Sequence, residues 1–164
     1  MQISAIRVII TGGTFDKSYD AVKGELTFTG SHLPEILTQL NLTVPVTLEI
    51  NQLVDSLYMD EDGRRRVLEA CRTAAETHIV VIHGTDTMTE TARLIGEAAL
   101  RKRVVLTGAM VPYAVRGSDA LFNLGFAVAA VQLVEPGTYV AMSGSVYPWN
   151  RVRKNREAGR FEGM

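Results

Sequence analysis

Residues 6–14 read Ile-Arg-Val-Ile-Ile-Thr-Gly-Gly-Thr, a β-branched apolar run that ends in two glycines between threonines. A continuous apolar run of this kind predicts a strand covered on both faces, and the glycines predict a loop after it. The pattern returns at residues 79–83 (IVVIH), which lead into Gly84-Thr85-Asp86-Thr87. Two such strands indicate a parallel sheet sandwiched between layers of helices.

Strand-like and helix-like segments alternate along the rest of the chain. Strands are expected at residues 6–10, 46–50, 79–83, 103–107 and 139–142, and helices at residues 31–40, 60–77, 87–100 and 118–134. Ser31, Asp60 and either Ser118 or Asp119 are polar residues suited to helix starts. With right-handed crossovers, this alternation predicts an α/β, doubly wound, mostly parallel five-stranded sheet in flavodoxin-like order 2-1-3-4-5, with helices on both faces. We expect residues 1–164 to form this single domain.

The composition is that of an ordinary soluble domain. The chain has 164 residues, of which 46% are hydrophobic, and its 17 Lys and Arg against 18 Asp and Glu give a net charge of -1. This balance does not favour nucleic acid, and the sequence shows neither a membrane-spanning run nor a cleavable leader. Cys71 is the only cysteine, which excludes a disulfide within one chain. We therefore expect a cytoplasmic protein that binds neither nucleic acid nor membrane.

Threonines follow the ends of the first and third expected strands. In doubly wound sheets, ligands bind beyond the carboxyl ends of the strands, so Thr14, Thr85 and Asp86 are expected at one crevice. A threonine hydroxyl is a poor nucleophile until a neighbouring base or cation helps to remove its proton, and Asp86 and a lysine could supply that help. The glycines at 12 and 13 could bring backbone N–H groups to a ligand. The alternatives are a plain glycine turn, and a helix cap formed by Asp86 and Thr87.

Other reactive side chains are expected to have structural roles. His32, His78 and His83 lack metal-ligand spacing, and His83 is expected to be a hydrogen-bonded structural residue. Cys71 is expected to pack in the core. There is no G-x-G-x-x-G or P-loop spacing, so no nucleotide cofactor is expected. The basic segment 150–164 is either a surface appendage or a loop folded back over a site.

Assembly is suggested by the helix expected at residues 118–134. From Leu121 to Val134, apolar residues occupy most of its circumference. A helix that is hydrophobic all round must be covered on more than its sheet side. We therefore expect a homodimer or larger homo-oligomer.

Residues 11–14 (TGGT) and 83–92 (HGTDTMTETA) resemble the two signature motifs of the bacterial-type L-asparaginase family. The likeness continues through residues 105–110 (VLTGAM) and the helix start at 119–124 to the basic segment that carries Lys154. It covers nearly the whole chain and corresponds to the amino-terminal domain of the family. The resemblance implies hydrolysis of the side-chain amide of L-asparagine to L-aspartate and ammonia, with neither a metal nor an organic cofactor.

The resemblance also implies roles for individual residues. Thr14 matches the threonine that attacks the amide carbon, and Tyr19 matches the tyrosine that assists proton transfer. Thr85, Asp86 and Lys154 match the second threonine, the aspartate and the lysine of the family's triad. Which threonine attacks first stays open at this point, with Thr14 preferred.

Substrate contacts are implied for Gly13, Ser56, Gly84 and Ala109. Ser56 matches a serine that contacts the substrate's α-groups, and the Ala109 carbonyl could accept a hydrogen bond from the leaving amide nitrogen. Leu57 stands where the family has a glutamine, and we expect the second, smaller domain of the family to be absent. Two other functions remain open: a non-catalytic amino-acid-binding or sensing domain derived from an asparaginase, and a flavodoxin-like nucleotide or flavin protein.

Overall fold

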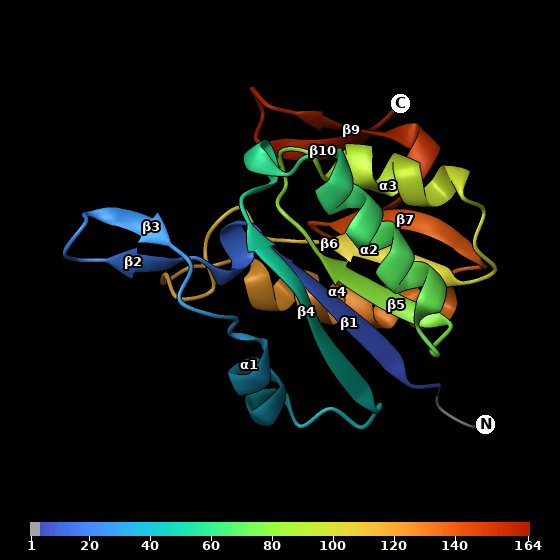
Figure 1. Cartoon of the computed structure of the whole chain (residues 1–164), viewed down its shortest axis with the longest axis horizontal. Coiled ribbons are helices and arrows are strands. Elements are labelled where there is room, and N and C mark those ends of the chain that lie inside the picture. Colours follow the sequence, from blue (N-terminus) through green and yellow to red (C-terminus); the bar gives the residue numbers. More distant parts are fainter. Residues whose placement is uncertain (1–3) are drawn as a thin grey trace.

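The computed structural model describes residues 4–164 and contains a six-stranded central sheet (Figure 1). The five parallel strands lie in the order β4 (Val46–Val54), β1 (Ile6–Gly12), β5 (His78–Ile82), β6 (Arg103–Thr107) and β7 (Gly137–Met142). Counted along the chain among these five, this order is 2-1-3-4-5. The doubly wound α/β class is confirmed. The expected number of strands is one too few, because β8 (Ser145–Pro148) adds an antiparallel edge strand next to β7.

Helices cover both faces of the sheet. They are α1 (Leu33–Leu40), α2 (Glu61–Thr73), α3 (Met88–Glu97) and α4 (Ala120–Leu133). Successive side chains of β1 point to opposite faces: Val8 and Ile10 are buried with α1 and α4, whereas Ile9 is buried with α2 and α3. Both sets are fully buried, which explains why the strands are continuous apolar runs without alternating polar residues.

Helix α2 begins where the sequence predicts and ends earlier than expected. The Asp60 carboxylate accepts a hydrogen bond from the Gly63 N–H at 2.7 Å and so caps the first turn. The helix ends at Thr73, short of the expected residue 77, because Ala74 adopts an extended conformation. The residues that follow lead directly into β5.

Two short hairpins lie outside the sheet, and neither was expected from the sequence. The first hairpin is β2 (Ser18–Asp20) with β3 (Glu25–Thr27), and it projects away from the body of the molecule (Figure 1). The second hairpin is β9 (Val152–Asn155) with β10 (Arg160–Gly163), and it lies along α3 (Figure 1). The basic segment 150–164 is therefore folded back onto the domain.

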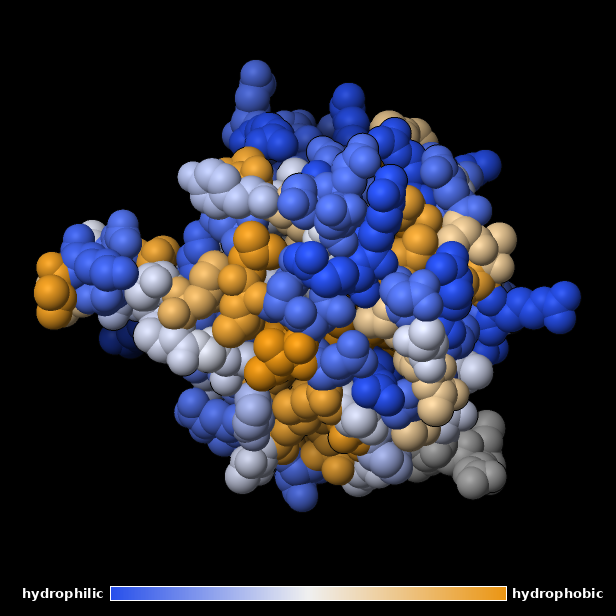
Figure 2. Space-filling model, in the orientation of Figure 1, coloured by the Kyte–Doolittle hydropathy of each residue, from blue (hydrophilic) through white to orange (hydrophobic). Residues whose placement is uncertain are grey.

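The surface differs between the two sides of the view in Figure 2. Hydrophobic surface lies over β4 and α1 and at the tip of the projecting hairpin, whereas the α2 side is mostly hydrophilic (Figure 2). Consistent with this, Val22 at the hairpin tip is 97% exposed. In residues 4–164, no helix has both the length and the apolar character that crossing a membrane requires.

Candidate active site

Glycine packing brings two loops together at the carboxyl ends of β1 and β5. Gly13 has φ +72°, and a Cβ atom there would lie 2.5 Å from Cα of Gly84. A Cβ atom on Gly84 would in turn lie 2.5 Å from the Ser56 Oγ. Only glycine permits both approaches. The loops that carry Thr14 and Thr85 are therefore held in contact, as the topology predicts.

The Gly13 amide is not available to a ligand. Its N–H donates a hydrogen bond to the Val54 carbonyl at 2.9 Å, and Gly12, at φ +98°, packs against the backbone of Val54. The expectation that this glycine's N–H approaches a ligand is therefore wrong. The glycines serve instead to pack backbone against backbone.

Lys154 reaches the β5–α3 loop from the hairpin β9–β10. Its Nζ donates to the Thr85 Oγ1 at 2.9 Å and to the Asp86 Oδ1 at 2.8 Å. The hairpin is anchored because Val152 and Phe161 are buried against the α3 side of the core. Thr85, Asp86 and Lys154, predicted from distant parts of the chain, are thus brought together.

Arg156 is a residue of the site that the sequence did not single out. Its guanidinium donates to the Asp86 backbone carbonyl at 3.1 Å and to the Asp86 Oδ1 at 3.4 Å. It lies in the hairpin turn two residues beyond Lys154. Its membership of the same basic segment was the one available signal.

The alternative that the Asp86 and Thr87 side chains simply cap the following helix is wrong. No side-chain hydrogen bond caps the start of α3. The Thr87 hydroxyl donates instead to the Ser56 carbonyl at 2.9 Å, and the Thr87 N–H donates to the Ser56 Oγ at 3.3 Å. Ser56, only 1% exposed, therefore holds the β5–α3 loop in place through its two hydrogen bonds with Thr87.

His83 holds the same loop from the core side. Its Nδ1 lies 2.8 Å from the Gly84 carbonyl, and its Nε2 lies 2.8 Å from the Thr91 hydroxyl. Because a carbonyl only accepts, Nδ1 carries the proton and Nε2 accepts from Thr91. Complete burial lowers the pKa of His83 to about 4, so the ring is neutral near pH 7. The predicted structural role of His83 is confirmed.

The loop after β6 is fixed by two polar side chains of α4 and its start. The Asp119 carboxylate accepts from the Met110 and Val111 N–H groups at 3.0 Å, and the Asn123 side chain donates to the Gly108 carbonyl at 2.9 Å. Ala109, between them, is buried. Within residues 4–164, no donor reaches the Ala109 carbonyl, so this oxygen is free to accept a hydrogen bond.

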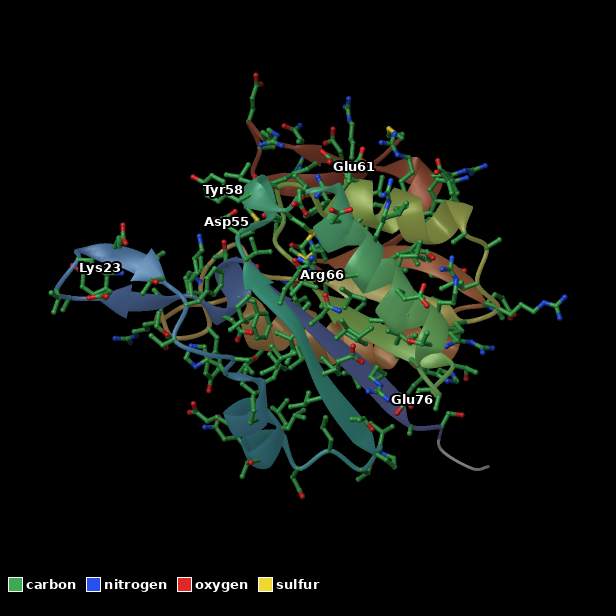
Figure 3. The ribbon with its side chains drawn as sticks, viewed as in Figure 1. Lys23, Asp55, Tyr58, Glu61, Arg66 and Glu76 are labelled. Atoms are coloured by element: carbon green, nitrogen blue, oxygen red, sulfur yellow. The ribbon has the colours of Figure 1, made fainter. Side chains whose placement is uncertain are left out.

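Tyr19 is not brought to the cluster formed by Thr85, Asp86 and Lys154. It lies on β2 in the projecting hairpin and is 66% exposed. The hairpin root is tied to the body by the ion pair of Lys17 with Asp55, and Asp55 and Lys23 in Figure 3 mark the root region and the distant tip. Burial alone would raise the pKa of Asp55, but hydrogen bonds from Lys17 and the Leu57 amide lower it below its usual value.

Cys71 is buried on α2, which confirms its expected place in the core, and burial raises the pKa of its thiol to about 12. Over the part of the chain that the structure describes, no three His, Cys, Asp or Glu side chains are grouped to hold a metal ion. The chemistry that the cluster offers is a hydroxyl and a carboxylate joined by one ammonium group.

Comparisons with known proteins agree on one family. The model of the family "Asparaginase, N-terminal" matches residues 5–161. The chain is similar to L-asparaginase 1 of Escherichia coli K12, with 30% identity over 76% of this chain and 39% of that protein. It is also similar to the glutaminase-asparaginase of Acinetobacter glutaminasificans, with 26% identity over 90% of this chain and 48% of that protein. The chain thus spans less than half the length of these relatives.

Solved structures show the same likeness. L-asparaginase I from Vibrio cholerae superposes with a TM-score of 0.81 at 22% identity, over 98% of this chain and 51% of that one. The thermostable L-asparaginase from Thermococcus kodakarensis gives 0.79 at 26% identity over the same shares. The probable cytoplasmic L-asparaginase from Campylobacter jejuni gives 0.77 at 25% identity.

Proposed function

The chain belongs to the asparaginase family, whose N-terminal domain corresponds to residues 5–161, and on that premise we propose that it hydrolyses the side-chain amide of L-asparagine to L-aspartate and ammonia. One observation carries the proposal: the Lys154 ammonium lies within hydrogen-bond distance of both the Thr85 hydroxyl and the Asp86 carboxylate. A binding protein has no need of a cation on a threonine hydroxyl. A positive charge there favours the deprotonated oxygen, as hydroxyl chemistry requires.

In the proposed mechanism, Thr14 is the nucleophile. Its Oγ attacks the side-chain carbonyl carbon, and its proton passes to the amide nitrogen, which leaves as ammonia when the C–N bond breaks. The acyl-enzyme ester is then attacked by water, which releases L-aspartate and returns a proton to Thr14. The cluster of Thr85, Asp86 and Lys154 assists these proton transfers, because the ammonium lowers the pKa of the Thr85 hydroxyl.

Four further roles follow from the same proposal. Asp86 pairs with the substrate α-ammonium, because its carboxylate is partly exposed. The free carbonyl of Ala109 accepts a hydrogen bond from the amide nitrogen. Gly13 and Gly84 act by letting the loops meet. Tyr19 assists proton transfer only when the hairpin β2–β3 turns toward Thr14.

We also propose that the protein acts as a homo-oligomer. The outer face of α4 carries no charged residue, and Phe122 and Leu133 on it are 62% and 83% exposed in the single chain. Covering this face with a second copy would remove that apolar area from water. Light scattering on the purified protein at micromolar concentration tests this, and a monomeric mass contradicts it.

The deciding experiment is ammonia release from L-asparagine and L-glutamine by the purified protein. Thr14→Ala and Thr85→Ala are each expected to lower turnover by orders of magnitude while the fold is kept. The matched control is Thr73→Ala, which changes an exposed threonine at the C-terminal end of α2. Binding of L-asparagine without ammonia release would instead identify a non-catalytic amino-acid-binding domain.

A further inference from the structure

Arg156 and Asp86 form an ion pair at the outer side of the proposed site. The guanidinium Nη1 lies 3.4 Å from the Asp86 Oδ1, and Nη2 lies 3.1 Å from the backbone carbonyl of the same residue. This second bond fixes the guanidinium relative to the loop that carries Thr85. The pair therefore presents a positive and a negative group side by side in a defined orientation.

The guanidinium has hydrogen-bonding capacity to spare. It carries five N–H donors, and the contacts with Asp86 use two of its nitrogens once each. The Arg156 side chain is 62% exposed, whereas the Lys154 side chain is 11% exposed and already holds Thr85 and Asp86. Of the two cations on Asp86, Arg156 is thus the one that a ligand can reach.

Asp86 also keeps one oxygen for a ligand. Both cations contact Oδ1, and in the described part of the chain no group donates to Oδ2. The carboxylate is 31% exposed. It can therefore accept an ammonium group on Oδ2 while Arg156 stays in place.

The other residues near this position offer fewer donors for a carboxylate than Arg156 does. Ser56 is buried and its hydroxyl accepts from the Thr87 N–H, which leaves it a single O–H donor, while the exposed Leu57 side chain has no polar group. Two nearby cations are committed to carboxylates elsewhere, Lys17 to Asp55 and Arg153 to Glu162. The cluster of Lys154, Arg156 and Asp86 has two positive groups and one negative group, so one cation is available to pair with a substrate carboxylate.

We propose that Arg156 is a specificity-determining residue that binds the α-carboxylate of the amino-acid substrate, while the neighbouring Asp86 binds its α-ammonium. A free amino acid carries these two groups on one carbon, so its carboxylate can face the Arg156 guanidinium while its ammonium faces the Asp86 carboxylate. Guanidinium is well suited to carboxylates because its parallel N–H groups can bind both oxygens. The inference rests on the proposed amidohydrolase function and extends it to the choice of substrate.

The test compares L-asparagine with two analogues that each lack one α-group. Succinamate lacks the α-ammonium, and 3-aminopropanamide lacks the α-carboxylate. Arg156→Gln is expected to lower kcat/KM for L-asparagine and succinamate by roughly 10–100-fold, mainly through KM, because one charge-assisted hydrogen-bonded pair is lost. It is expected to change kcat/KM for 3-aminopropanamide by less than about twofold. Arg156→Lys should restore part of the loss.

Two controls separate binding from structure. Arg160→Gln removes an exposed arginine from the same hairpin without touching Asp86, and all three amides should be used as by the unchanged protein. If Arg156→Gln lowers kcat/KM equally for all three amides, Arg156 acts only by supporting Asp86 and the proposal is wrong. An unchanged preference among the amides also overturns it.

Failure of the proposed function is distinguishable from failure of this inference. If no ammonia is released, calorimetric titration with L-asparagine and 3-aminopropanamide replaces the kinetic assay. The unchanged protein should bind L-asparagine more tightly by roughly tenfold or more, and Arg156→Gln should abolish that difference. Equal affinities in the unchanged protein, or no binding of either amide, would overturn the role of Arg156.

Discussion

The two hairpins of this domain differ in what holds them, and the difference decides which one carries part of the site. Hairpin β9–β10 is buried against α3 through Val152 and Phe161, and its Lys154 reaches Thr85 and Asp86. In residues 4–164, hairpin β2–β3 is held near its root, where Lys17 pairs with Asp55 and the Ser18 hydroxyl lies 3.0 Å from the His32 Nε2. Beyond the root, Tyr19, Val22 and Leu26 are all exposed. Apolar anchors on hairpin β9–β10 thus position the side chain that we propose to be catalytic, and the other hairpin, which lacks such anchors, projects from the body of the molecule.

The largest expected effect is that of Lys154→Met on turnover. We expect kcat for L-asparagine to fall by roughly 10³-fold, because the ammonium that favours the Thr85 alkoxide is lost. Lys23→Met, in the exposed turn of the other hairpin, should leave kcat within about twofold, since surface substitutions rarely matter. Steady-state ammonia release measures both. Similar losses in the two variants would remove the distinction between the hairpins.

The next effect is on stability. Phe161→Ala should lower the free energy of unfolding by about 3–5 kcal/mol, because it removes a buried aromatic side chain that packs the hairpin onto α3. Leu26→Ala, on a half-exposed residue of the projecting hairpin, should change it by less than about 0.5 kcal/mol. Urea denaturation followed by circular dichroism gives both values. A small change in Phe161→Ala would mean that the docked hairpin is as loosely held as the other.

The third effect is a dependence of the free energy of unfolding on pH, caused by His83 beneath the loop that Lys154 contacts. The unfolded chain protonates His83 below its ordinary pKa of 6.5, whereas in the folded state burial lowers that pKa to about 4. Acid therefore favours unfolding, and the contribution of His83 should lower the free energy of unfolding by about 2 kcal/mol between pH 7 and pH 5.

An NMR titration of the His83 ring checks this value directly. A folded-state pKa near 6.5 would contradict it, because the ring would then not be buried beneath the loop. The difference between the pH profiles of the unchanged protein and His83→Gln isolates the contribution of this residue from that of the carboxylates.

The smallest expected effect is that of Tyr19→Phe. Because Tyr19 lies on the projecting hairpin, its hydroxyl should contribute only about tenfold to kcat, below the roughly 10²-fold or greater effect of a positioned acid–base group. The same ammonia assay measures it. A loss as large as that in Lys154→Met would show that the two hairpins are equally placed over the substrate during turnover.

Much of the architecture could be predicted because it follows from local patterns. Continuous apolar runs gave the five parallel strands, and the alternation with helices gave their arrangement. The strand missed, β8, follows a two-residue turn at Ser143 and Gly144, both with positive φ. Such a dipeptide is a hairpin signal. The strand that follows is only four residues long, so its own pattern is too short to predict it.

The site was predictable in part for the same reason. Thr14, Thr85 and Asp86 follow strand ends, and strand ends of a parallel sheet meet at one edge. The position of Arg156 could not be predicted, because it depends on contacts between hairpin β9–β10 and α3 that no local pattern records. The exposure of Tyr19 likewise depends on tertiary packing, because the sequence of a short hairpin does not show whether other elements pack against it.

The docked hairpin also carries its own optical reporter. Trp149, the only tryptophan of the chain, lies in the turn before β9 (residues 149–151) and packs so closely on α3 that a Cβ atom on Gly96 would lie 2.4 Å from its ring. Indole emission shifts to longer wavelength when the ring becomes hydrated. Fluorescence of the unlabelled protein should therefore follow release of this hairpin from α3 in real time, separately from the circular dichroism of the helices.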